Sequence, residues 1–238
     1  MRSHGQNLWF VRRAARRFMP GVEFDDMLAA ADTLRPHGIH AAFTRLGENV
    51  SDWHEAEYVT GHYLGAIDRI TAAGIICEPS VKPTQLGLDL DKERCFENLR
   101  TLAARAKAAG NYLWIDMEQS PYVDVTLELT KRIRAQFDNV GVCLQAYLYR
   151  TTNDLKALRE QGIGVRLVKG AYKEASSVAM AKKADVDENF FTLAVAMLEP
   201  SGRPASFRAV FGTHDVPLIA RIQAHAERAG AAAAGVEI

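Results

Sequence analysis

The chain has 238 residues, of which 48% are hydrophobic, so it is long enough for one large domain or two small ones with a sizeable core. Its 29 basic and 29 acidic residues give a formal net charge of zero, which favours neither a nucleic acid nor an acidic surface as partner. Cys77, Cys95 and Cys143 are odd in number and lack metal-ligand spacing. We therefore expect buried thiols in a reducing cytoplasm rather than a disulfide framework.

The first ~40 residues are expected to be helical, with breaks at residues 20–21 and 36–38 that contain proline and glycine. The N-terminal stretch carries Arg12, Arg13, Arg16 and Arg17, no acidic residue, and no apolar core of a signal peptide. A basic amphipathic helix can make peripheral contact with a membrane surface. An ordinary helix with a solvated basic face is the commoner structure, and we favour it. No apolar run approaches the length of a membrane span.

From residue 39 onward, short apolar runs alternate with helical segments. Strands are expected at residues 39–45, 74–81, 112–117, 140–147, 164–169 and 206–212. Helices are expected at residues 53–72, 91–109, 123–137, 152–161, 187–198 and 216–229. Asp91 and Asn153 are candidate N-caps, and a glycine follows four of the helix ends at residues 74, 110, 162 and 230. Strands and helices that alternate in this way predict parallel βα units.

The pattern shows no linker, so we expect one domain over residues 1–238, with a helical segment at 1–38 and the βα units at 39–238. Residues 235–238 resemble the start of a seventh strand. Six βα units and this start fit either an open doubly wound sheet or an incomplete eight-stranded barrel. The first strand is followed by residues 44–49, which lack the glycine-rich phosphate turn of a dinucleotide-binding fold.

Polar residues recur where these strands end, which is where parallel α/β enzymes place their sites. An arginine inside a buried strand needs a partner, so Arg166 indicates a carboxylate or a ligand in the interior. Each polar residue also has a purely structural explanation, such as a rim lysine at Lys82 or helix caps at Asp116 and Asp215. Their recurrence over five consecutive units favours a site: Lys82; Asp116 and Glu118; Gln145 and Tyr147; Lys169 and Tyr172, beside Gly170; Thr213, His214 and Asp215.

Several chemistries are disfavoured by missing motifs. The sequence has no HExxH, no CxxC and no two-histidine-plus-carboxylate pattern, so we expect no metal site. It has no GxSxG elbow, which disfavours an α/β-hydrolase. Lys169 is a candidate Schiff-base nucleophile, although nothing in the sequence establishes the lowered pKa that this role needs. Cations, an amide, an imidazole and a hydroxyl around one mouth suit a flat cofactor with an anionic reduced state, such as a flavin.

The motifs at residues 80–83, 115–118, 142–147, 166–172 and 212–215 resemble, in order, the strand ends of the proline dehydrogenase family. Residues 46–48 resemble the end of that family's first strand, and Lys173-Glu174 is more similar to the short monofunctional bacterial form. The resemblance implies a (βα)₈ TIM-type barrel that holds FAD at its mouth. It also implies oxidation of L-proline to Δ1-pyrroline-5-carboxylate, with a hydride passing to flavin N5 and the electrons then passing to a quinone.

The same resemblance implies roles for individual residues. Asp116 and Arg166 would be catalytic, with Arg166 near flavin N5, and Lys82 would bind the substrate beside Asp116. Tyr147 and Tyr172 would form walls of the pocket. The residues implied to bind the cofactor, several of them through the backbone, are Met117, Gln145, Arg166, Val168, Lys169, Gly170, Ala171, Thr213 and His214.

Members of the family continue beyond the equivalent of residues 235–238. The resemblance implies that they complete the seventh strand and add an eighth strand and a final helix. An arginine pair and an aromatic residue on that helix bind the substrate carboxylate. We expect these parts to be lacking here, so an inactive fragment or pseudoenzyme is the alternative function, with a Schiff-base barrel enzyme behind it.

Overall fold

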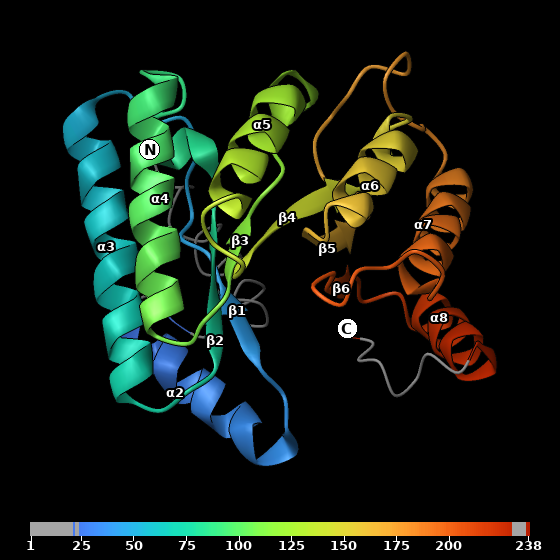
Figure 1. Cartoon of the computed structure of the whole chain (residues 1–238), viewed down its shortest axis with the longest axis horizontal. Coiled ribbons are helices and arrows are strands. Elements are labelled where there is room, and N and C mark those ends of the chain that lie inside the picture. Colours follow the sequence, from blue (N-terminus) through green and yellow to red (C-terminus); the bar gives the residue numbers. More distant parts are fainter. Residues whose placement is uncertain (1–20, 22–23, 230–236) are drawn as a thin grey trace, which may run out of the picture.

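The computed structural model describes residues 21, 24–229 and 237–238. The expected basic N-terminal helix, the glycine at 230 and residues 235 and 236 therefore lie outside the described residues. What is described is a curled sheet with helices arranged in an arc around its outer face (Figure 1). The helix arc runs from α3 through α5 to α8 in the order of the sequence.

Six parallel strands follow one another across the sheet in sequence order, each paired with the next. This order excludes a doubly wound sheet, whose strand order reverses, and confirms the βα-barrel class. Within the described residues β1 and β6 do not pair, so the sheet is curled and open. The strands are β1 Ala41–Phe43, β2 Cys77–Val81, β3 Leu113–Ile115, β4 Val140–Gln145, β5 Gly164–Val168 and β6 Ala209–Gly212.

The helices lie close to their predicted positions. They are α2 Phe24–Leu34, α3 Trp53–Ala72, α4 Lys92–Ala108, α5 Val123–Arg134, α6 Thr151–Glu160, α7 Lys183–Leu198 and α8 Val216–Arg228. The short 3₁₀ turns are η1 Arg35–His37, η2 Pro83–Leu86 and η3 Ser120–Tyr122. Among the described helices, none is both long enough and apolar enough to cross a membrane.

One of the two expected N-cap residues caps its helix and the other does not. The carboxylate of Asp91 accepts hydrogen bonds from the backbone N–H groups of Glu93 and Arg94, as expected of an N-cap. Asp215 caps α8 in the same way through Leu218 N–H. The expectation for Asn153 was wrong, because α6 begins two residues earlier and Asn153 lies in its first turn.

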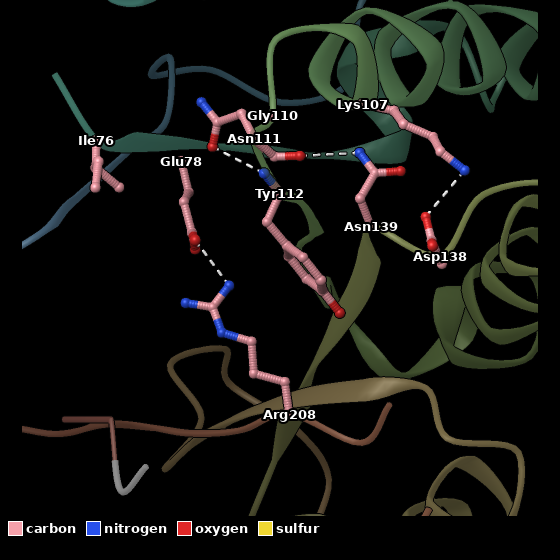
Figure 2. Close-up of a pocket in the computed structure, with 9 residues that line it drawn as sticks. All are labelled: Ile76, Glu78, Lys107, Gly110, Asn111, Tyr112, Asp138, Asn139 and Arg208. Carbon is pink, nitrogen blue, oxygen red and sulfur yellow. Dashed lines mark hydrogen bonds and ion pairs between the residues drawn. The ribbon is translucent and has the colours of Figure 1, made fainter. Parts of the chain in front are cut away.

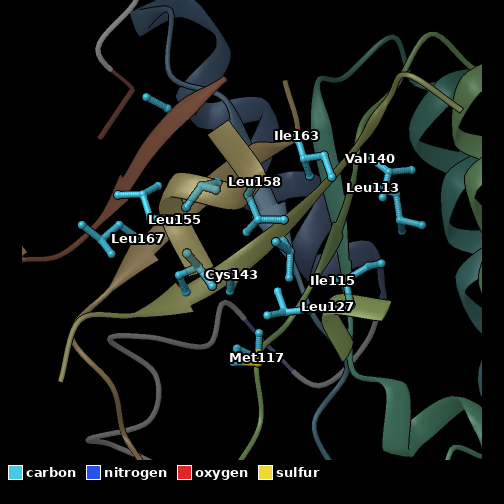
Figure 3. Packing of buried hydrophobic residues seen from close by; sticks show 14 of the residues in the cluster. Leu113, Ile115, Met117, Leu127, Val140, Cys143, Leu155, Leu158, Ile163 and Leu167 are labelled. Atoms are coloured by element: carbon cyan, nitrogen blue, oxygen red, sulfur yellow. The ribbon is translucent and has the colours of Figure 1, made fainter. Parts of the chain in front are cut away.

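The two faces of the strands have different partners. In β5, Val165 and Leu167 are buried on the outer face, against the helices, whereas Arg166 points into the barrel. The outer faces of β3 and β4 are equally apolar, and their residues pack with the inner stripes of α5 and α6 (Figure 3). The helices thus seal the hydrophobic core on the outside of the sheet. The polar residues of the strands are left to face the interior.

The C-terminal residues continue the sheet beyond β6. Phe211 N–H donates to the carbonyl of Glu237 at 2.9 Å, and Glu237 forms a parallel bridge with Val210. The Glu237 carboxylate also pairs with Arg208, through Nε at 2.6 Å. Glu237 therefore lies where the predicted seventh strand would lie.

Candidate functional site

Four consecutive strands direct one polar side chain each into the barrel at the same level. Ser80 of β2, Cys143 of β4 and Arg166 of β5 meet Asp116, which directly follows β3. Arg166 Nη2 donates to Asp116 Oδ1 and, at 2.7 Å, to Ser80 Oγ. Ser80 Oγ donates in turn to Asp116 Oδ1 at 2.7 Å. The interior carboxylate that Arg166 required is therefore Asp116, and both predicted catalytic residues belong to one cluster.

Lys82 joins this cluster from the end of β2. Its Nζ lies 3.9 Å from Asp116 Oδ2, and the side chains of Lys82 and Asp116 are only 15% and 16% exposed. Two cations thus face one carboxylate in a largely buried place. Because Asp116 is shared, the cluster retains positive charge that suits an anionic substrate or an electron-rich cofactor.

Gln145 lies one step nearer the mouth, at the end of β4. Its amide nitrogen donates to the carbonyls of Met117 and Glu118 at 2.9 and 3.1 Å, which fixes the orientation of the amide. Its Oε1 is buried and has no hydrogen-bond partner among the described residues. A buried amide oxygen without a donor is costly, so this atom is suited to accept a hydrogen bond from the N–H of a bound group.

The side chain of Lys169 points away from the cluster of Lys82, Asp116 and Arg166. Its Nζ donates to Asp187 of α7 and, at 2.7 Å, to Asp215 at the start of α8. The hydrogen bond from Lys169 is the main reason that the pKa of Asp215 is lowered to about 2. The amine is thus hydrogen-bonded to two carboxylates on the helix side of the sheet, whereas a Schiff-base nucleophile must point toward its substrate. The geometry therefore disfavours the Schiff-base alternative and leaves only the backbone of Lys169 to face a cofactor.

The other expected cofactor residues lie at the same edge of the sheet. Val168 pairs with Gly212 of β6, and the exposed His214 follows two residues later. Thr213 Oγ1 accepts a hydrogen bond from Asp215 N–H at 3.1 Å, which shapes the turn that presents His214. Met117 is buried beneath this edge, and Ala171 is exposed on it.

Gly170 adopts a left-handed conformation at φ 112°. A Cβ at this position would lie 2.3 Å from the Tyr147 ring. The Tyr147 ring therefore packs directly on the backbone of Gly170, where a side chain would not fit. This contact ties the end of β5 to the segment that follows β4.

Glu118 has a structural role that the sequence did not reveal. It is 2% exposed, and its carboxylate accepts hydrogen bonds from Thr84 N–H at 3.1 Å and from Thr84 Oγ1. Burial raises the pKa of Glu118, and the hydrogen bonds from Thr84 partly oppose that shift. The contact fixes η2, the turn that begins directly after Lys82. The only sequence feature that pointed to this turn was the Lys-Pro-Thr run at residues 82–84, directly after a predicted strand.

A pocket of about 430 Å³ lies at the opposite end of the strands (Figure 2). Its lining residues precede or begin β2, β3, β4 and β6, as Figure 2 shows for Glu78, Tyr112, Asn139 and Arg208. Arg208 Nη1 donates to Glu78 at 2.7 Å, so the charges in this pocket pair with each other. The N-terminal end of a barrel normally serves stability, and the site is therefore the cluster at the C-terminal ends.

Comparison with known proteins gives one consistent family. A family model described as proline dehydrogenase matches residues 27–238. The chain is 34% identical over 210 residues to proline dehydrogenase 1 of Bacillus subtilis, covering 88% of this chain and 68% of that protein. It is 33% identical over 190 residues to a proline dehydrogenase of Deinococcus radiodurans, covering 78% of this chain and 60% of that protein. The chain thus spans between three fifths and about two thirds of these relatives.

Solved structures agree with the fold. Proline utilization A from Bdellovibrio bacteriovorus, inactivated by N-propargylglycine, superposes with a TM-score of 0.84 at 24% identity. That match covers 95% of this chain and 28% of the larger protein. A mutant of proline utilization A from Bradyrhizobium japonicum gives a TM-score of 0.69 at 25% identity, over 79% of this chain and 23% of that one.

Proposed function

Because the chain belongs to the proline dehydrogenase family, we propose that it oxidises L-proline to Δ1-pyrroline-5-carboxylate with FAD as cofactor and a quinone as electron acceptor. The observation that carries the proposal is the cluster of Lys82, Asp116 and Arg166, held together at the C-terminal ends of the strands. In this family-based proposal, residues 1–238 act as one FAD-binding barrel domain.

The chain's own residues fit a flavin. Bound flavin supplies the chemistry of accepting a hydride from the carbon beside the proline nitrogen. Gln145 Oε1 lacks a donor and suits the N–H edge of such a ring. Arg166 supplies fixed positive charge, which stabilises negative charge on a reduced ring. The remaining cofactor surface in this proposal is formed by Met117, Val168, Lys169, Gly170 and Ala171, with Thr213 and His214 toward the phosphate and ribitol.

Lys82 and Asp116 shape the substrate pocket in this proposal. Lys82 Nζ lies 3.9 Å from Asp116 Oδ2, beyond ordinary hydrogen-bond distance, so its donors stay available to an anionic group of proline. Asp116 keeps both cations oriented through Coulomb attraction and the hydrogen bond from Arg166. Tyr147 and Tyr172 remain proposed walls of the pocket, and Tyr172 is anchored by donating to Glu48 at 2.6 Å.

The quinone acceptor suggests where the reaction takes place. Membrane quinones are apolar, so we propose a cytoplasmic enzyme that makes peripheral contact with the inner face of a membrane. Three free and buried cysteines support a reducing compartment.

The test is proline-dependent reduction of a dye acceptor by the FAD-loaded chain. We expect Arg166→Met to lower kcat at least tenfold, about the effect of one charge-assisted hydrogen bond, and to weaken FAD binding. Lys82→Ala should mainly weaken proline binding, which raises the KM for proline. The matched control is Lys92→Ala, which removes an exposed lysine of α4. Loaded protein that shows no proline-dependent reduction, or unchanged kinetics in both site variants, would refute the proposal.

A further inference from the structure

Cys143 lies in the middle of β4 and directly opposite Arg166 in the register of the two strands. It is 3% exposed. Arg166 Nε donates to its Sγ at 2.9 Å, and the Sγ–H donates to Asp116 Oδ1 at 3.2 Å. The thiol therefore contacts both members of the ion pair, in addition to the direct bond between them.

The thiol is suited to this bridging place because it is neutral and has both a donor and an acceptor. Burial raises the pKa of Cys143 to about 12, so the group stays protonated and adds no charge beside Asp116. An apolar side chain here would leave Arg166 Nε buried without its acceptor, which is costly. These properties also make Cys143 a poor nucleophile, because the thiolate is the reactive form.

Arg166 is restrained on three sides. Its guanidinium carbon lies 5.5 Å from the centre of the Trp114 ring, which is itself fixed by donating to Glu78 at 2.6 Å. Ser80 and Asp116 hold Nη2, and Cys143 holds Nε. Among the described residues these contacts leave Nη1 as the nitrogen available to a bound group. The hydrogen bond from Nε to Cys143 restrains rotation of the guanidinium about the Cδ–Nε bond.

We propose that Cys143 is a positioning residue, whose thiol fixes the orientation of the Arg166 guanidinium and the Asp116 carboxylate so that Arg166 Nη1 faces the flavin. The inference rests on the proposed function and deepens it. The thiol itself touches neither cofactor nor substrate in this proposal and acts only through the two charged side chains.

Enzyme kinetics tests the catalytic half of the inference. Cys143→Ala should lower kcat about tenfold and change KM less than about twofold, since the substrate contacts remain. Cys143→Ser keeps a donor and an acceptor and should restore most of the activity. In an Arg166→Met background, Cys143→Ala should cause little further loss. The control is Cys77→Ala, which removes a thiol buried on the outer face of β2. Unchanged kcat in Cys143→Ala, or a loss that serine does not rescue, would overturn the inference.

An infrared measurement tests the hydrogen bonds without cofactor or turnover. The S–H stretching band of Cys143 is assigned as the band lost in Cys143→Ala. We expect it at a lower frequency than a thiol without a strong acceptor, and we expect Asp116→Asn to shift it upward. A band that Asp116→Asn does not move would refute the bridging thiol. If the wild-type chain shows no proline turnover, the proposed function fails. The position of this band still decides whether the Cys143 thiol donates a hydrogen bond to Asp116.

Discussion

Removing the charge of Arg166 or Asp116 separately, and then both together, measures how strongly the central ion pair is coupled. The two side chains are 17% and 16% exposed, so the pair is largely buried. Arg166→Met leaves the Asp116 carboxylate with Ser80 at 2.7 Å, Cys143 at 3.2 Å and Lys82 at 3.9 Å. Asp116→Asn leaves the guanidinium with Ser80 and Cys143.

The magnitude follows from the partners that remain. Loss of one member of a buried pair generally costs ~3–5 kcal/mol, and the remaining contacts of Asp116 place Arg166→Met near the lower end. We expect about 3 kcal/mol for Arg166→Met and about 2 kcal/mol for Asp116→Asn, since the arginine keeps two neutral acceptors. The double variant leaves no uncompensated charge in the pair. Its loss should therefore fall about 2 kcal/mol short of the sum of the two single losses.

Urea unfolding of the cofactor-free chain near neutral pH, followed by circular dichroism, gives the four free energies of unfolding. The matched control is the exposed pair Lys92–Glu128, whose side chains are 42% and 46% exposed. For Lys92→Met and Glu128→Gln we expect a coupling of about 0.5 kcal/mol or less. Losses at Arg166 and Asp116 that simply add, within about 0.5 kcal/mol, would show that the two residues are not coupled and would refute the reasoning.

Three further predictions concern the surroundings of the cluster. Gly170→Ala should destabilise the chain by at least ~2 kcal/mol, because the φ of Gly170 is 112° and an added Cβ would meet the Tyr147 ring. The control Gly65→Ala, in an unobstructed part of α3, should stabilise the chain by roughly 0.5–1 kcal/mol. Thermal unfolding measures both, and equal effects would contradict the close contact between Gly170 and Tyr147. Burial raises the pKa of Glu118 above 4.5, so the folded chain binds its proton more tightly and loses stability as pH rises through the raised pKa. Glu118→Gln cannot ionise, so its Tm relative to wild type should rise between about pH 4 and about pH 8, and a constant difference would show that the carboxyl is not perturbed. Burial raises the pKa of the thiols of Cys77, Cys95 and Cys143 to about 12. A thiol reagent at about pH 8 should therefore label none of them in the folded chain and all three in urea. Rapid labelling of the folded chain would contradict their burial.

The sequence predicted the order of strands and helices well because each signal was local. The helix at residues 53–72 was predicted with the bounds that α3 shows. A glycine at φ 64° follows its end, as expected, and Asp52, which was not among the expected caps, caps its start. Helix α7 begins four residues earlier than expected, at Lys183. Its N-cap residue makes no side-chain cap, so no start signal marks that turn.

The site was predictable in outline but not in its pairings. Alternation along β5 showed that Arg166 faces the interior and needs a partner. It did not show which residue is the partner, because Asp116 and Ser80 come from other strands. The register between two strands cannot be read from the sequence of either strand alone. The bridging thiol of Cys143 was missed for the same reason. Lys169 was expected to face the cofactor largely through its backbone, and the sequence did not show that its side chain pairs with Asp187 of α7 and Asp215 at the start of α8.

The most direct test of the proposed function is anaerobic titration of the FAD-loaded chain with L-proline, followed through the visible absorption of the flavin. We predict that proline bleaches this absorption, that D-proline does not, and that an added quinone restores it. Flavin that binds and then stays fully oxidised in excess L-proline would contradict the proposal that the cluster of Lys82, Asp116 and Arg166 supports proline oxidation.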